Sequence, residues 1–504
     1  MANDDTAIER QLQRAEELRT QHQFQDAASI YQSILEGHPD HAETLYQFGV
    51  MANMTGQHEV AADLISRAID RAGDEGIRYV PELAPALALS GRREEALGAF
   101  RRWTDALPND PNGHYNKGNL LNGMGRADEA AQSFRRAVAL APDFAEAQAN
   151  LGATLHMTKR YDEAARAYRR AIRKLGNNSE LHHNLGAVLR AQHKNDEAVA
   201  AYRKALAIKP DRLEVRENLA GALQDLGEYS EAAELFGDML DQIPTSVDAI
   251  KGFAETLIAA DKADDAAARC DTFLAAHGYN SAVVACKAIA LQELGNDVEA
   301  QRIMDFERFI CPIDVPVPDG YEDIAAFNGA IEAEIRADES LDFEPLGRAT
   351  AAGFQTDELL DGPTPAIALL ARFIDDSVQG YIDRLPDDPH HPFVANAPRR
   401  WTKNGWGVIL QSHGHQRPHI HPSGWLSGVY YVRVPDSIGD ASQHGWIEFG
   451  RPPANVGCRT EHPTTRVRPQ AGRMLLFPSY VYHDTVPFED EENRISFAFD
   501  ILPA

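Results

Sequence analysis

Three histidines in the C-terminal part of the sequence have the spacing of ligands to one metal ion. His419 and His421 are two residues apart, and His483 follows the β-type stretch 474–482. On a strand, residues i and i+2 point to the same face, so both imidazoles of the pair can reach one ion. Three neutral nitrogen ligands favour a transition metal over calcium or magnesium. We therefore predict a metal site at His419, His421 and His483.

An arginine and a serine follow this group closely in the sequence. Arg494 lies eleven residues beyond His483. Strand alternation over 494–499 places Arg494 and Ser496 on one face and three apolar residues on the other. An arginine on a polar interior face needs an anion, and a guanidinium group matches a carboxylate through two hydrogen bonds. The neighbouring hydroxyl can supply a further bond. We predict an anion site at Arg494 and Ser496.

Together these motifs resemble the iron(II)- and 2-oxoglutarate-dependent oxygenases, a superfamily with a double-stranded β-helix fold. The segments HIHPSGWLSGVYYV, AGRMLLFPSYVYH and NRISFAF are similar to a bacterial branch of these oxygenases, and the likeness covers about 315–504. The resemblance implies that His419 and His483 bind Fe(II). It also implies that Arg494 and Ser496 hold the distal carboxylate of the cosubstrate 2-oxoglutarate. The implied activity is that of a dioxygenase that hydroxylates its substrate.

The residue at position 421 departs from most of this superfamily. An Asp or Glu usually stands there and completes a triad of two histidines and one carboxylate. Two ligand sets therefore fit the sequence: three imidazoles, or His419 and His483 alone, as in the aspartyl/asparaginyl β-hydroxylases. We predict that His421 is a ligand. Glu448 and Asp484 are alternative carboxylates, for which we expect a structural role.

Two other functions fit the same residues. The spacing of Gly472, Pro478 and His483 resembles the second cupin motif, and a cupin-type dioxygenase or isomerase would not need Arg494 or 2-oxoglutarate. The glutamate expected in the first cupin motif is missing after His421. The other alternative is a non-catalytic scaffold that only binds peptides. Dependence of turnover on 2-oxoglutarate and the binding of iron separate these functions.

Short β-type runs must position the candidate site. They are separated by Pro, Gly and Asp and occupy 407–411, 428–434, 446–449, 473–478 and 494–501. Several short strands at this spacing indicate a sandwich or barrel. Apolar periodicity predicts helices over 321–340 and 362–384. Residues 321–504 are thus expected to form a double-stranded β-helix (jelly-roll or cupin-like) domain with flanking helices. The Pro-rich stretch 307–320 is expected to be a linker.

The N-terminal 300 residues repeat with a period of 34. Pro108 and Pro142 are 34 apart, as are Pro210 and Pro244. Each of nine units carries an alanine, and in most units a bulky residue stands four positions after it. A small residue also recurs in the first helix of most units. The alanines are Ala27, Ala61, Ala96, Ala130, Ala164, Ala198, Ala232, Ala266 and Ala300. The pattern resembles the tetratricopeptide repeat over 8–306. This resemblance implies an all-α right-handed superhelix whose concave groove binds a protein or peptide.

Four asparagines occupy one position of successive repeats, just before the small residue. They are Asn116, Asn150, Asn184 and Asn218. The row resembles the asparagine ladder in the superhelix of O-linked N-acetylglucosamine transferases, which holds an extended peptide by its backbone. An amide can do this because it both donates and accepts hydrogen bonds. The alternative is that the amides only join neighbouring helices. A peptide-binding ladder is the functional prediction.

Composition restricts the partners and the location. The 504 residues hold 49 Lys+Arg and 76 Asp+Glu, a formal charge of −27, which disfavours nucleic acid and anionic lipid and favours a cationic or neutral partner. The acidic start MANDDTAIERQ and the lack of an 18-residue apolar run lead us to expect a cytoplasmic protein without a membrane segment. The four cysteines have no CxxC spacing and are expected to be reduced, partly buried thiols. The oligomeric state cannot be predicted from these features.

Overall fold

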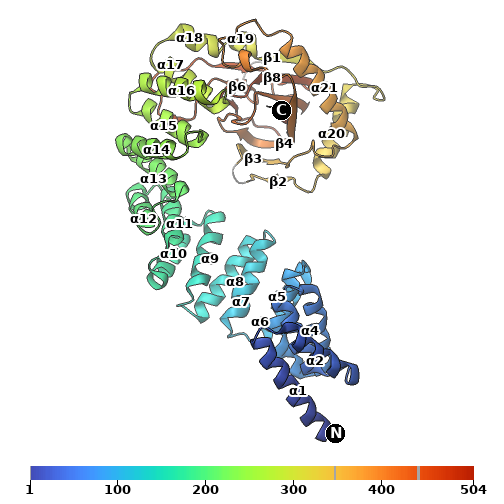
Figure 1. Ribbon diagram of the computed structural model, residues 1–504. Coiled ribbons are helices and arrows are strands. Elements are labelled where there is room, and N and C mark those ends of the chain that lie inside the picture. Colours follow the sequence, from blue (N-terminus) through green and yellow to red (C-terminus); the bar gives the residue numbers. More distant parts are fainter. Residues whose placement is uncertain (1, 346–347, 440–442) are drawn as a thin grey trace. The chain divides into compact units, whose positions relative to one another are not determined.

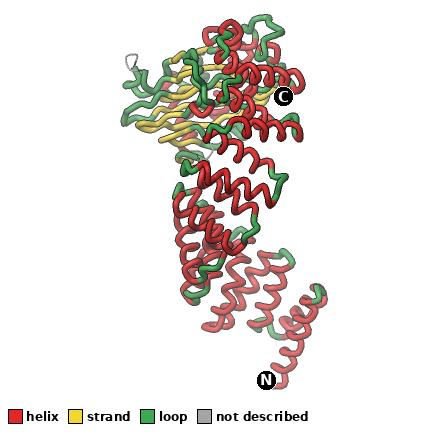
Figure 2. Tube along the Cα trace, turned by 90° about the vertical axis from the view of Figure 1, so that its left-hand side faces the viewer, coloured by secondary structure: helices red, strands yellow, loops and turns green. Residues whose placement is uncertain are grey.

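The structure is a computed structural model that describes residues 2–345, 348–439 and 443–504. The chain divides into two compact units, residues 1–222 and residues 223–504 (Figure 1). Unit 1 is helical. Unit 2 contains further helices and, in its C-terminal part, the strands (Figure 2). No helix among the described residues is long and apolar enough to cross a membrane.

Unit 1 is a series of helix pairs, as the period of 34 predicts. Consecutive helices of each pair pack against each other. The helices are α1 (Ala2–Thr20), α2 (Phe24–Gly37), α3 (Ala42–Met54), α4 (His58–Ala72), α5 (Val80–Leu89), α6 (Arg93–Ala106), α7 (Pro111–Gly123), α8 (Ala127–Leu140), α9 (Ala145–Met157), α10 (Tyr161–Leu175), α11 (Ser179–Ala191), α12 (Asn195–Ile208) and α13 (Leu213–Leu226), with a short 3₁₀ helix, η1 (Gly73–Tyr79). Helix α13 crosses from the first unit into the second.

The repeated small and bulky residues meet inside each pair. A Cβ atom on Gly118 would lie 2.7 Å from the ring of Phe134, and one on Gly186 would lie 2.6 Å from the ring of Tyr202. Because that is closer than van der Waals contact, only a residue without a side chain lets the two helices approach this far. The close helix contact predicted from the small residues is confirmed.

The repeat pattern continues into unit 2. Its helices are α14 (Tyr229–Gln242), α15 (Val247–Ala259), α16 (Ala263–His277), α17 (Ser281–Glu293), α18 (Asp297–Ile303), α19 (Phe306–Phe309), α20 (Ile324–Ala337) and α21 (Pro365–Ile382). The last of the repeated alanines, Ala300, lies in α18 and is buried like the others. All nine alanines thus fall in the second helix of successive pairs within the described residues. Helices α20 and α21 correspond to the two helices predicted over 321–340 and 362–384.

The C-terminal part of unit 2 contains two antiparallel sheets. The larger has the strand order β1-β8-β5-β10-β4-β3-β2 and the smaller the order β7-β6-β9. The strands are β1 (Cys311–Asp314), β2 (Asp342–Phe343), β3 (Thr350–Gln355), β4 (Trp401–Gln416), β5 (Leu426–Arg433), β6 (Ile447–Phe449), β7 (Thr465–Val467), β8 (Arg473–Pro478), β9 (His483–Thr485) and β10 (Arg494–Pro503), with 3₁₀ helices η2 (Val394–Asn396) and η3 (Ala454–Val456). The five predicted runs correspond to β4, β5, β6, β8 and β10.

The two faces of the larger sheet have different neighbours. On one face, the Tyr430 hydroxyl of β5 donates a hydrogen bond of 2.6 Å to Asn328 of α20. The opposite face is turned toward the smaller sheet, where the rings of Phe477 and Phe449 are 4.9 Å apart. Strand alternation places Arg494 and Ser496 on this second face, as predicted. The region between the sheets is therefore where the candidate site residues point.

The predicted linker 307–320 contains ordered elements. Helix α19 ends at Phe309, and β1 then pairs with β8 at the edge of the larger sheet. Proline is tolerated on an edge strand because only one side of that strand needs hydrogen-bond donors. Pro312 can therefore lie inside β1, although a cluster of prolines is typical of a linker.

Candidate metal centre

The backbone holds His419 beside His483. The His419 N–H donates to the His483 carbonyl over 3.1 Å, and the His483 N–H donates back over 3.0 Å. The His421 N–H donates to the Ser479 carbonyl over 3.0 Å. These bonds fasten the segment after β4 to the start of β9. The sequence predicted a strand at the histidine pair. In the structure, His419 forms only an isolated bridge with His483, and His421 lies outside the strands.

Backbone carbonyls orient the rings of His419 and His483. The Nδ1 atom of His419 lies 2.7 Å from the Arg417 carbonyl, and that of His483 lies 3.1 Å from the Val481 carbonyl. A carbonyl oxygen can only accept, so in each ring Nδ1 carries the hydrogen. The Nε2 atom of each neutral ring is left with a free lone pair, which is the form that binds a metal.

A carboxylate orients the ring of His421 in the same way. Its Nδ1 atom lies 2.8 Å from Asp500 Oδ2, and Ser427 donates to the other oxygen of Asp500 over 2.7 Å. The Ser427 hydroxyl also bonds Ser479 over 2.8 Å. A carboxylate behind a ligating histidine fixes the ring and raises its basicity. The arrangement suits His421 to be a third ligand.

The three rings converge on one point. One nitrogen from each of His419, His421 and His483 lies within 4.8 Å of the other two. The Nε2 atoms of His421 and His483 are 3.3 Å apart, although both rings donate their hydrogens elsewhere. Burial, followed by the neighbouring His421, lowers the pKa of His419 to about 4. Burial and the other two rings hold the pKa of His483 well below its ordinary value. Neutral imidazoles with facing lone pairs are what a divalent transition metal requires.

The two alternative carboxylates lie outside this group. Glu448 and Asp484 are cross-strand partners in the smaller sheet, and strand alternation turns Asp484 away from the face of His483. Glu448 bonds Arg466 over 2.8 Å and pairs with Arg451. Burial, followed by the charge of Glu448, raises the pKa of Asp484 to about 6. The ion pairs of Glu448 agree with the structural role expected for that residue.

Arg494 and Ser496 line a cavity together with the three histidines. The Arg494 side chain is buried, and its Nε atom has no hydrogen-bond partner among the described residues. The guanidinium carbon lies 5.0 Å from the ring centre of Tyr431, and the charge of Arg494 acts on that buried phenol. Burial raises the pKa of Tyr431, so the phenol keeps its hydrogen. An unpaired buried donor is costly, and a carboxylate in the cavity would satisfy that of Arg494. The charge of Arg494 and the hydroxyl of Ser496 thus fit one carboxylate of 2-oxoglutarate.

The motifs do not single out three contributors to this site. Asp500 bonds a histidine 79 positions before it, Tyr431 is the cross-strand partner of Ser496, and Trp406 stacks on His421 with ring centres 5.8 Å apart. Each contact depends on the pairing of β10 with β4 and β5. The one available sequence signal was parity, since Asp500 is an even number of residues beyond Arg494 and so shares its face.

The four asparagines of the predicted ladder lie on the first helices of successive repeats in unit 1, and all are half-buried. Asn150 Nδ2 donates to Asn119 Oδ1 of the preceding repeat over 2.7 Å. Asn218 Nδ2 lies 3.0 Å from His183 Nε2, again one repeat back. Among the described residues, no side-chain hydrogen bond involves Asn116 or Asn184. Two of the four amides thus bridge neighbouring helices, and two do not.

A second group of potential ligands lies where α17 meets the loop between β6 and β7. It consists of Glu293, Cys458 and His462. The Glu293 carboxylate accepts bonds from the N–H groups of Arg459 and Thr460, from the Thr460 hydroxyl and from His462 Nε2 at 2.9 Å. Because four donors already bond this carboxylate, the group joins the helix to the loop through hydrogen bonds. We call it the clamp.

Models of known families match both parts of the chain. Residues 404–500 match the family described as "Putative 2OG-Fe(II) oxygenase". Residues 12–76 and 115–179, and residues 189–252 and 223–288, match two tetratricopeptide-repeat families. The matched ranges include the three histidines, Arg494 and Ser496, and three of the four ladder asparagines. No match was found among curated proteins.

Solved structures resemble the helical part of the chain. MamA from Desulfovibrio magneticus RS-1 is 22% identical, with 34% of this chain and 95% of that chain covered and a TM-score of 0.32. YrrB, described as a TPR protein with an unusual peptide-binding site, is 22% identical. The match covers 38% of this chain and 97% of that chain, with a TM-score of 0.34. The C-terminal part of a TPR repeat-containing protein from Cytophaga hutchinsonii is 14% identical, with 48% and 98% covered and a TM-score of 0.43.

Proposed function

We propose that this protein is an Fe(II)- and 2-oxoglutarate-dependent hydroxylase of a protein or peptide. The proposal starts from the tetratricopeptide repeats within 12–288 and the match to the putative 2OG-Fe(II) oxygenase family at 404–500. The observation that carries the proposal is one cavity lined both by three converging histidines and by a buried arginine with an unsatisfied donor. A metal site alone would not need that arginine.

The metal would be held by Nε2 of His419, His421 and His483, and 2-oxoglutarate by Arg494, Ser496 and Tyr431. When bound, Fe(II) and 2-oxoglutarate supply the activation of dioxygen by oxidative decarboxylation. The protein contributes orientation and exclusion of water. Arg494 and Ser496 line the cavity in which the carboxylate would lie, and the carbonyl and carboxylate partners fix the three rings before any ligand arrives. The apolar walls at Phe477 and Val429 limit the access of water.

The two antiparallel sheets, the helices on one face and the site between the layers support a double-stranded β-helix for the residues after the repeats. We assign the repeats, predicted over 8–306, to recruitment and the domain predicted over 321–504 to reaction. Asn116 and Asn184, whose amides bond no other side chain in the described ranges, are the ladder positions best able to hold a peptide backbone.

Succinate formation tests the proposed chemistry. Purified full-length protein, Fe(II) and a cell extract should yield succinate only when 2-oxoglutarate and oxygen are present. Arg494→Ala should remove that yield and leave iron binding intact, whereas Arg308→Ala, an exposed arginine of α19, should behave as the wild type. Oxidation of substrate without 2-oxoglutarate would instead indicate a cupin-type enzyme.

Capture of the substrate tests the recruitment step. The full-length His483→Ala variant serves as bait because it should bind a partner without releasing a modified product. The captured protein, treated with the wild-type enzyme, should gain the mass of one oxygen atom. The double variant Asn116→Ala/Asn184→Ala should capture less. Equal capture by this variant would show that the asparagine ladder does not bind the substrate.

A further inference from the structure

A surface pocket that shares His419 with the cavity of the candidate metal site, which we call the mouth, has a charge opposite to that of the whole chain. Eleven residues line it, among them His419, and three of them are arginines: Arg348, Arg417 and Arg451. None of the eleven is acidic, although the chain has 76 acidic and 49 basic residues. The remaining lining is mostly apolar, with Pro418, Ile420 and Pro452–Ala454. A strongly acidic protein thus presents a local basic surface beside a metal ligand.

Arg417 is the arginine nearest the chemistry. Its carbonyl holds the ring of His419, and its Nη2 donates to the Arg348 carbonyl over 3.0 Å. Within the described part of the chain, no carboxylate forms an ion pair with Arg417, and its side chain is exposed. An exposed, fixed guanidinium without a counter-charge favours an incoming anion, because no internal partner has to be displaced.

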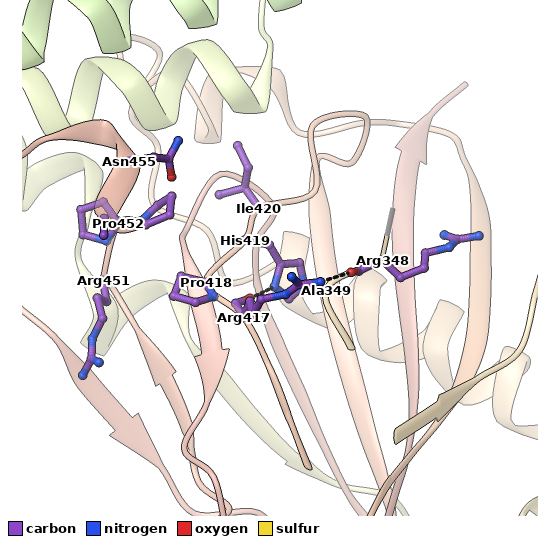
Figure 3. Close-up of a pocket in the computed structure, with 11 residues that line it drawn as sticks. Arg348, Ala349, Arg417, Pro418, His419, Ile420, Arg451, Pro452 and Asn455 are labelled. Carbon is purple, nitrogen blue, oxygen red and sulfur yellow. Dashed lines mark hydrogen bonds between the residues drawn. The ribbon is translucent and has the colours of Figure 1, made fainter. Parts of the chain in front are cut away.

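The other two arginines stand on opposite sides of His419. In Figure 3, Pro452 and Arg451 lie on one side of His419 and Pro418, and Ala349 and Arg348 lie on the other. Arg451 pairs with Glu448, which also pairs with Arg466, and the charges of both arginines act on Asp484 as well. Arg348 pairs with Asp357 at 3.7 Å. Guanidinium groups therefore lie on both sides of His419.

One wall of this mouth is fastened to the last repeat helices. Residues Arg451–Asn455 belong to the loop between β6 and β7, and a few residues later Glu293 of α17 binds that loop through Arg459, Thr460 and His462. Arg459 also pairs with Asp261, just after α15, at 2.6 Å. The loop is thus held at its far end, which keeps Arg451 and its neighbours in place without a ligand.

We propose that the mouth selects a polypeptide substrate with acidic residues on both sides of the residue that enters the pocket. This inference rests on the proposed function, since it takes the His419 pocket as the place of reaction. The substrate would cross the mouth in an extended form, with its apolar atoms against Pro418, Ile420 and the prolines of the loop. Carboxylates before and after the reacting residue would meet Arg451, Arg417 and Arg348. The net charge of the chain predicted a cationic or neutral partner, and the mouth reverses that expectation locally.

Matched peptide pools test the proposal without any turnover. Three pools of fluorescent peptides of equal length have a randomised central residue that is flanked by Glu in the first pool, Gln in the second and Lys in the third. Their binding to the full-length protein is followed by fluorescence anisotropy. We expect the Glu pool to bind about tenfold more tightly than the Lys pool at low salt, since each exposed ion pair contributes a few-fold and three arginines act together. Added salt should reduce the difference.

Substitutions at the mouth make the test specific. Arg417→Glu should lower or reverse the preference for Glu over Lys, and Arg417→Lys should keep it, because the charge is retained. Arg308→Gln is the matched control and should change nothing. A preference that survives Arg417→Glu, or a Lys pool that binds as tightly as the Glu pool, would overturn the proposal. So would tighter binding of a single-stranded oligonucleotide than of the Glu pool. Iron and 2-oxoglutarate binding by the same protein shows independently whether the proposed function stands.

Discussion

Two clusters in unit 2 contain histidines within ligand distance of further donors, yet their surroundings differ. At His419, His421 and His483, each Nδ1 has an acceptor and each Nε2 is left facing the others. At Glu293, Cys458 and His462, the carboxylate already accepts four hydrogen bonds. Burial, followed by the charge of Glu293, raises the pKa of Cys458 to about 12, so the thiol keeps its hydrogen. Composition and proximity alone do not define a metal site. What distinguishes the first cluster is that the Nε2 lone pairs of its rings accept no hydrogen bond from another kind of residue in the described part of the chain.

The largest effect is expected from loss of a histidine in the first cluster. His419→Ala should abolish turnover and lower iron affinity by more than about 100-fold. The loss of a ligand should weaken iron binding more than the loss of a residue that only orients a ligand. Partner capture should be unchanged, since the repeats are untouched. The measurement is succinate release together with iron affinity. Full activity in this variant would show that the ligand assignment is wrong.

Removal of the carboxylate behind His421 should have the next largest effect. Asp500→Ala frees the ring and should reduce iron affinity by about 10-fold to 100-fold. Asp314→Ala is the control, because Asp314 is an exposed carboxylate paired with Arg473 at the edge of the same sheet. Iron titration of both variants is the measurement. An unchanged affinity in Asp500→Ala would favour the two-histidine set, in which His421 is not a ligand.

In the second cluster, Glu293→Gln should affect stability and leave iron binding unchanged. Burial alone would raise the pKa of Glu293, but the bonds from Thr460, Arg459 and His462 outweigh it and lower the pKa to about 2. A carboxylate whose folded pKa lies below its unfolded value of 4.5 stabilises the fold above pH 4.5, and this stability is lost as the pH falls toward 2. At neutral pH we expect a loss of about 1–3 kcal/mol on denaturant unfolding.

The pH dependence provides the control for this variant. The stability difference between wild type and Glu293→Gln should shrink between pH 4.5 and pH 2, where the wild-type carboxylate takes up its proton. A constant difference over that range would mean that the ionised form of Glu293 is not what fastens the loop.

The smallest effect is expected from Cys458→Ser. The thiol is protonated and makes no metal bond in the clamp interpretation, so the change should alter stability by less than about 1 kcal/mol and leave the iron content unchanged. Denaturant unfolding and metal analysis are the measurements. Loss of a bound metal in this variant would show that the second cluster is a metal site.

The sequence was sufficient for features that depend on spacing. The period of 34 placed the helix pairs, and the alternation in 494–499 placed Arg494 and Ser496 on the cavity face. All four cysteines are free, as expected. Asp500, Tyr431 and the clamp at Glu293 could not be predicted, because each depends on strand register or on contacts across more than 60 residues. The ordered strand β1 was missed because prolines hide an edge strand.

Anaerobic titration with Fe(II) is the most direct test of the central claim. It should be carried out on wild-type protein and on two matched variants, His483→Ala and His462→Ala. We predict one iron per chain in the wild type, no tight site in His483→Ala and one unchanged site in His462→Ala, with 2-oxoglutarate tightening the site only where iron binds. Iron that persists in His483→Ala, or disappears in His462→Ala, would contradict the assignment of the metal centre.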